Sequence, residues 1–71
     1  MRTWKRKGYK VIEKPFDFNL HEFDIVLDNG EVVGTITPAT LDDMETIIAD
    51  LNAGEDVNGW EDSMGNTIYV K

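Results

Sequence analysis

Hydrophobic and polar residues alternate most regularly in two segments, 23–28 and 31–37, which are separated by Asn29-Gly30. Such alternation is typical of strands with one buried face, and Asn-Gly favours a two-residue type I′ turn between paired strands. The pattern therefore predicts a β-hairpin in which Asp28 faces Glu31. This register predicts a core face made of Phe23, Ile25, Leu27, Val32 and Ile36, and it places Asp24, Val26, Val33 and Thr35 on the opposite face.

The segment before this hairpin predicts further extended structure. Residues 8–13 are rich in β-forming side chains, and Tyr9 and Val11 fall on one side of the expected strand. Pro15 cannot donate a backbone hydrogen bond to a neighbouring strand. The alternation of residues 16–20 fits either a second extended segment or a loop anchored by hydrophobic side chains.

A helix is predicted after Pro38-Ala39, which ends the second strand of the hairpin. Thr40 is a suitable N-cap, and the carboxylates that follow it favour the positive end of the helix dipole. Gly54 is the natural stop. The hydrophobic stripe expected on the buried side of this helix consists of Leu41, Met44, Ile47, Ile48 and Leu51.

These elements predict an α+β fold, in which one amphipathic helix packs on one face of a small, mostly antiparallel sheet of three to five strands. The expected order is β-β-β-α-β, with a last strand over residues 66–70 and a second hairpin over residues 58–70. The 71 residues suffice for a single domain, 1–71, in which residues 1–7 could form a flexible basic arm. The hydrophobic residues left on the uncovered face would be Ile12, Val26, Val33 and Tyr69.

Charge is distributed unevenly along the chain. Residues 1–14 contain six basic side chains and one acidic one, whereas residues 15–71 contain thirteen acidic side chains and one basic one. A split of this kind concerns partners and association rather than the fold. The net charge of −7 repels a polyanion, so nucleic-acid binding is not expected even though Trp4 and Tyr9 lie among the basic residues.

The inventory of reactive side chains is small. The chain has no cysteine, and its one histidine, His21, lies beside Glu22 in a segment where a solvated or capping histidine is the common case. We therefore expect no enzyme activity and no cofactor. The absence of cysteine fits a reducing compartment, and no hydrophobic run has the length of a signal or membrane segment, so a cytoplasmic location without membrane contact is expected.

One segment approaches the pattern of a calcium-binding loop. Gly54 brings no side-chain oxygen to a ligand position, and Glu55 stands where the sharp turn of such a loop needs glycine. An acidic loop after a helix explains the same residues, so no metal is expected. The ligand positions of the loop would be Asp50, Asn52, Gly54, Asp56, Asn58 and Glu61.

Binding of another protein is the remaining class of function. The acidic residues of the helix and the following loop could imitate a row of phosphates for a nucleic-acid-binding protein, or they could simply form a solvated face. Trp60 is either a binding residue, since tryptophan is enriched at binding hot spots, or a plug at the end of the core. The candidate partner-binding residues are Trp4, Arg6, Lys7, Val26, Val33, Trp60, Glu61 and Asp62.

The segment 50–69 resembles the ending of small uncharacterised proteins of phages and mobile elements of Gram-positive bacteria. The resemblance is carried by Gly54-Glu55-Asp56, then Gly59-Trp60-Glu61-Asp62, then Gly65-Asn66-Thr67. It implies an intracellular accessory or host-directed role and transfers no site residues.

The sequence thus predicts a non-enzymatic protein-interaction module whose partner is unidentified. The alternatives are an acidic, nucleic-acid-mimicking inhibitor of a nucleic-acid-binding protein and a structural protein that forms a homodimer through the uncovered face of the sheet.

Overall fold

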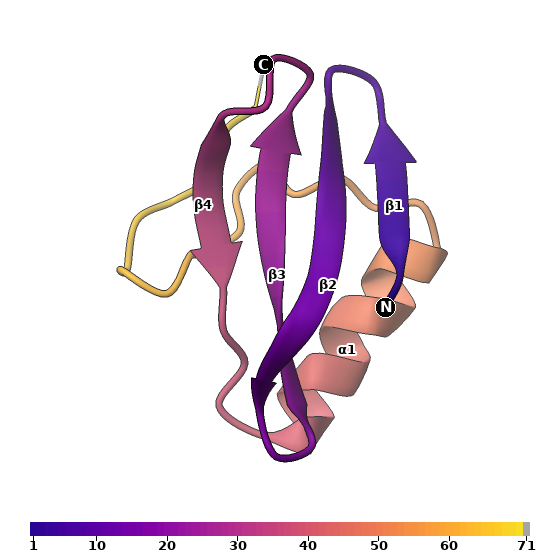
Figure 1. Cartoon of the computed structure of the whole chain (residues 1–71), viewed down its shortest axis with the longest axis vertical. Helices are drawn as coiled ribbons and strands as arrows, with labels where there is room; N and C mark the ends of the chain where they lie inside the picture. The colour runs from indigo at the N-terminus through magenta and orange to yellow at the C-terminus, as the bar shows by residue number, and fades with distance from the viewer. Residues whose placement is uncertain (71) are drawn as a thin grey trace.

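Four strands follow one another along the chain and pair in the same order in one antiparallel sheet (Figure 1). The computed structural model describes residues 1–70. The α+β fold class is confirmed, and the elements have the order β-β-β-β-α. They are β1 (Thr3–Arg6), β2 (Tyr9–Asp17), β3 (Leu20–Leu27), β4 (Val32–Ile36) and α1 (Leu41–Asn52).

The second layer lies on one face of this sheet and consists of α1 together with the segment that follows it (Figure 1). The helix begins as predicted, with the side chain of Thr40 accepting a hydrogen bond from the backbone N–H of Asp43 at 3.1 Å. It ends at the predicted stop, where Gly54 has a φ of 93°. Within residues 1–70, no helix combines the length and hydropathy needed to cross a lipid bilayer.

The core lies between the two layers. Leu51 is the one residue of α1 in the buried class, whereas Met44, Ile47 and Ile48 pack against the core from its margin. Val57 and Ile68 from the C-terminal segment supply the hydrophobic surface that one short helix cannot. The largest side chains that are fully buried are Phe23, Ile25, Leu51, Val11 and Val57.

The turn between β3 and β4 differs from the prediction. Leu27 and Glu31 pair through a hydrogen bond from Leu27 N to Glu31 O at 2.8 Å, so the turn has three residues rather than two. The side chain of Asn29 accepts a hydrogen bond from the backbone N–H of Glu31 at 2.9 Å. Of the three turn residues, only Gly30 has a positive φ, 91°. A three-residue turn that ends in a left-handed glycine is the next most common hairpin connection.

The added turn residue changes which valine of β4 is buried. A β-bulge between Ile25 and Val26 shifts the register back. Beyond it, Ile25 pairs with Gly34 and Phe23 pairs with Ile36, as predicted. Between the turn and this bulge, however, Val32 lies opposite Val26 and is 54% exposed. Val33 packs against the core instead. The predicted positions of Val32 and Val33 were therefore wrong, because one bulge exchanges the two faces.

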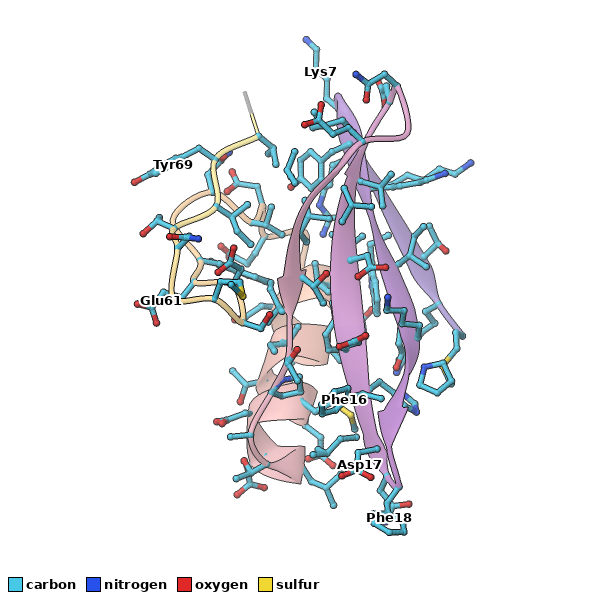
Figure 2. All side chains as sticks on the ribbon, turned by 60° about the vertical axis from the view of Figure 1, so that its left-hand side comes forward. Lys7, Phe16, Asp17, Phe18, Glu61 and Tyr69 are labelled. Atoms are coloured by element: carbon cyan, nitrogen blue, oxygen red, sulfur yellow. The ribbon has the colours of Figure 1, made fainter. Side chains whose placement is uncertain are left out.

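The two segments that precede β3 are both part of the sheet. Residues 3–6 of the expected basic arm form β1, and Tyr9 and Val11 lie on the buried side of β2 as predicted. Of residues 16–20, the first two end β2, Leu20 begins β3, and residues 18 and 19 form a tight turn between them. In this turn Phe18 has a φ of 35° and is fully exposed. Figure 2 shows Phe18 at this turn, at the opposite end of the sheet from Lys7.

The predicted final strand over residues 66–70 is absent from the described residues, and the isolated bridge between Glu61 and Thr67 is the ladder contact recorded there. Backbone hydrogen bonds nevertheless fold this segment back on itself, from Gly59 N to Ile68 O at 2.8 Å and from Ile68 N to Trp60 O at 2.7 Å. The segment also contacts the edge of β4, where Ser63 N donates to Thr35 O at 2.8 Å. It therefore covers part of the sheet edge without joining the sheet.

The C-terminal segment packs tightly against β4 at Gly34, since a Cβ placed there would lie 3.3 Å from Ile68 Cδ1. We predict that Gly34→Val lowers the free energy of unfolding by about 1–3 kcal/mol, because the added methyl groups overfill this contact. Urea unfolding measures the change. In an Ile68→Ala background the same substitution should cost clearly less, and an equal cost in both backgrounds would contradict the proposed contact.

Candidate functional site

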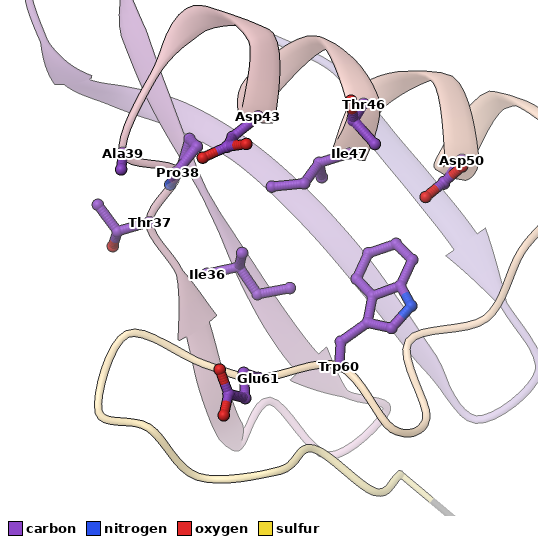
Figure 3. A pocket seen from close by; sticks show the side chains of 10 residues that line it. All are labelled: Ile36, Thr37, Pro38, Ala39, Asp43, Thr46, Ile47, Asp50, Trp60 and Glu61. Atoms are coloured by element: carbon purple, nitrogen blue, oxygen red, sulfur yellow. The ribbon is translucent and has the colours of Figure 1, made fainter.

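An open groove lies beside α1, between the end of β4 and the loop that carries Trp60 (Figure 3). Its volume is about 440 Å³, which lies within the range of roughly 300–1,000 Å³ found for ligand pockets. The groove is the candidate site. Its lining residues are Ile36, Thr37, Pro38, Ala39, Asp43, Thr46, Ile47, Asp50, Trp60 and Glu61.

The helix presents four of these residues because of its periodicity. Asp43, Thr46, Ile47 and Asp50 are spaced by three or four residues, which places them on one side of α1. This side borders the hydrophobic stripe and was missed at the sequence level, where Asp43 and Asp50 were interpreted as cap and loop acids. The sequence signal for this side of the helix was one residue of the hydrophobic stripe, Ile47, at helical spacing from the polar residues Asp43 and Asp50.

Trp60 is held in the opposite wall by its own backbone. Its N–H donates to Val57 O at 3.1 Å, and its carbonyl accepts from Ile68 N at 2.7 Å. The side chain is half-buried and packs against the core. Trp60 therefore packs against the core and also lines the groove.

The groove combines a hydrophobic floor with an acidic rim. Ile36, Ile47 and Trp60 supply hydrophobic surface, and the carboxylates of the rim come from Asp43, Asp50 and Glu61 (Figure 3). Among the described residues, no lysine, arginine or histidine lines the groove. Its electrostatic potential therefore favours a cationic group and disfavours phosphate.

The other predicted binding residues of the tail and sheet lie outside the groove. One carboxylate oxygen of Asp62 accepts hydrogen bonds from the backbone N–H groups of Met64 and Asn66, both at 2.9 Å, so it stabilises the loop. Val26 is only 7% exposed, and Val33 faces the core. The uncovered face of the sheet therefore presents Val32, which is 54% exposed, in place of Val33.

Trp4 and Arg6 connect β1 to the end of α1. Trp4 is 8% exposed, and its indole N–H donates to Asn52 Oδ1 at 2.8 Å. The guanidinium of Arg6 donates to Leu51 O at 2.7 Å and to Glu55 O at 3.0 Å. Leu51 O belongs to the last turn of α1, at the negative end of the helix dipole, where a cation is stabilising. Both side chains therefore have structural contacts remote from the groove.

The basic residues divide into a group with partners and a group without. Arg2 contacts Glu13, and Lys14 contacts Glu22 at 3.4 Å and Asp24 at 2.9 Å; the hydrogen bond to Asp24 raises the pKa of Lys14. Within residues 1–70, no ion pair includes Lys5, Lys7 or Lys10. Their charges remain available to solvent or to a partner.

His21 is paired with Glu13 rather than with the neighbouring Glu22. His21 Nδ1 lies 2.6 Å from Glu13 Oε2, while Arg2 Nε donates to Glu13 Oε1 at 3.0 Å. The Glu13 side chain is 2% exposed. Burial by itself would raise its pKa, but the hydrogen bonds from Arg2 and His21 outweigh burial and lower the pKa of Glu13 to about 2.

Residues of the calcium-like pattern make hydrogen bonds within the protein. Asn52 accepts from Trp4, Asp56 accepts from the backbone N–H of Asn58 at 3.0 Å, and Asn58 accepts from the backbone N–H of Val70 at 2.8 Å. In the part of the chain that the structure describes, no three acidic, histidine or cysteine side chains form a group that could hold a metal ion. These residues organise the C-terminal segment.

Comparisons with known proteins find no family model, no curated protein and no solved structure that matches this chain. Function is therefore inferred from the shape and charge of the groove.

The cluster around Glu13 makes stability depend on pH. Because the pKa of Glu13 falls from 4.5 to about 2 on folding, its contribution is complete above pH 4.5 and is lost as the pH falls through about 2. We expect this loss to be on the order of 2–3 kcal/mol, allowing for solvent screening of the half-exposed Arg2. Urea unfolding of the wild type and of Glu13→Gln from pH 7 to pH 2 measures it.

Glu13→Gln should be less stable at neutral pH and should approach the wild type near pH 2. A constant difference between the two proteins across the whole pH range would contradict this assignment.

Proposed function

We propose that this chain is a protein-interaction module that acts by binding rather than by catalysis, and that it binds its partner through the groove beside α1. The observation that carries the proposal is the combination of a hydrophobic floor and an acidic rim in one open groove of about 440 Å³. Resemblance of the tail to phage and mobile-element proteins extends the proposal to a host protein as the partner.

The composition of the groove supports recognition of a protein. A half-buried tryptophan beside aliphatic side chains, surrounded by charged residues, follows the usual anatomy of an interface, with a hydrophobic centre and a polar rim. The floor is formed by Ile36, Ile47 and Trp60 from three separate parts of the chain. A partner that fills it would contact β4, α1 and the C-terminal segment together.

Mimicry of nucleic acid is a second candidate, because several acidic residues of α1 and the following loop are exposed outside the groove. Asp42, Glu45 and Glu55 have exposed side chains and, within residues 1–70, are in no ion pair. If the acidic side chains imitate phosphates, the affinity of the partner depends on these three residues as strongly as on the acids of the groove. If the partner binds in the groove, its affinity depends little on the acids outside the groove.

We predict that Thr46→Arg abolishes binding of the partner. The new guanidinium would lie between Asp43 and Asp50 on the same side of α1 and would occupy the groove. Immobilised wild type and variant are exposed to the same bacterial lysate, and the retained proteins are quantified. A specific partner should fall by about tenfold or more with Thr46→Arg, as expected for blocking the centre of an interface.

Ala49→Arg is the matched control, because it adds the same charge to an exposed position of α1 that does not line the groove. It should retain the partner. Equal retention by wild type and both variants would sink the groove as the binding site, and equal loss from both would indicate general charge repulsion.

A further inference from the structure

We infer that the groove binds an arginine side chain presented by an extended segment of the partner protein. The inference rests on the proposed function and names the chemistry of the occupant. The guanidinium would lie among the rim carboxylates, and its aliphatic stem would cover the hydrophobic floor. Arginine unites these two requirements in one side chain, because its long stem packs on hydrophobic surface while its head remains charged.

The acids of the rim favour a cation inside the groove. Asp43 and Asp50 lie about two helical turns apart on the same side of α1. Glu61 lies on the facing C-terminal segment (Figure 3). Carboxylates from two sides therefore border the same space. Because the described lining residues include no base, this space has no internal counter-charge. An entering cation would supply it.

Trp60 distinguishes arginine from other cations. Indole is the best of the aromatic side chains at attracting a cation to its face, and arginine also stacks on it through its planar guanidinium. Figure 3 shows the indole beside Ile47 and Asp50, so that an aromatic surface and a carboxylate border the groove together. Lysine could satisfy the charge but offers neither a planar face nor paired donors for a carboxylate.

The shape of the groove indicates a segment of chain rather than a free small molecule. The groove is open to the surface and is not an enclosed cavity. An open groove buries one side chain of a passing segment while leaving its backbone at the surface. The hydroxyl groups of Thr37 and Thr46 donate to Glu22 Oε2 at 3.3 Å and to Asp42 O at 3.0 Å. Their oxygens can still accept a hydrogen bond from a backbone N–H of such a segment.

The two tryptophans provide separate reporters for a titration followed by NMR. Trp60 borders the groove, whereas the indole of Trp4 is buried and bonded to Asn52. The probes are blocked hexapeptides of arginine, lysine or glutamate, and Trp60→Phe assigns the two indole N–H signals. Hexa-arginine at about 20 mM salt should shift the Trp60 signal and leave the Trp4 signal unchanged, and about 300 mM salt should weaken the effect.

Hexa-arginine should bind at least about threefold more tightly than hexa-lysine, because only arginine stacks on the indole, and hexa-glutamate should not bind. Equal affinity for the two basic peptides would overturn the assignment of arginine. Failure of hexa-arginine to shift the Trp60 signal of the wild type would overturn the inference as a whole.

Two triple variants of equal charge locate the binding. Asp43→Asn with Asp50→Asn and Glu61→Gln removes the groove acids, and affinity for hexa-arginine should fall by about tenfold or more. Asp42→Asn with Glu45→Gln and Glu55→Gln removes three exposed acids that do not line the groove, and it should change affinity by less than about threefold. Equal losses would overturn the groove and favour mimicry.

The outcomes also separate this inference from the proposed function. If hexa-arginine leaves Trp60 unaffected while Thr46→Arg still removes a partner from the lysate, the groove binds a protein through other chemistry and only the inference fails. If hexa-arginine binds at Trp60 but Thr46→Arg retains every partner that the wild type retains, the proposed function fails.

Discussion

Burial of the C-terminal segment against the sheet is the constraint on which the rest of the structure depends. The helix has 12 residues and only Leu51 in the buried class, so it cannot cover four strands alone. Val57 and Ile68 complete the core, and Gly34 leaves the room that Ile68 occupies. In a domain this small each buried side chain is a sizeable part of the net stability. The groove follows from this packing, because burying the residues on either side of Trp60 holds its loop beside α1.

Polar contacts from β1 and β2 secure the same layer. Trp4 and Arg6 bond to groups at the end of α1, and the hydroxyl of Tyr9 accepts from the buried N–H of Val57 at 3.2 Å. The hydroxyl of Tyr9 thereby satisfies a buried backbone N–H of the irregular segment. The first two strands thus hold the helix end and the C-terminal segment in place, although they are far from both in sequence.

The uneven charge of the chain acquires a structural meaning from this arrangement. Arg2, Arg6 and Lys14 are used within the protein, whereas Lys5, Lys7 and Lys10 are in no ion pair among the described residues. The acids around the groove lie on the helix and the C-terminal segment. The exposed ion pairs contribute little to stability. The unpaired charges instead give the molecule a basic end at the β1–β2 turn and an acidic groove beside α1, which suit different binding surfaces.

The sequence by itself determined the elements whose signals are local. Alternation established β3 and β4, and the spacing of hydrophobic residues with Thr40 and Gly54 established the limits of α1. It could not decide the turn at Asn29, where a side-chain hydrogen bond to Glu31 replaces the expected geometry and thereby exchanges Val32 with Val33. Tertiary structure alone decided the path of residues 53–70, because hydrophobic burial there outweighs strand pairing. It also decided the groove, since Asp43, Asp50 and Trp60 meet only when that segment packs on the sheet.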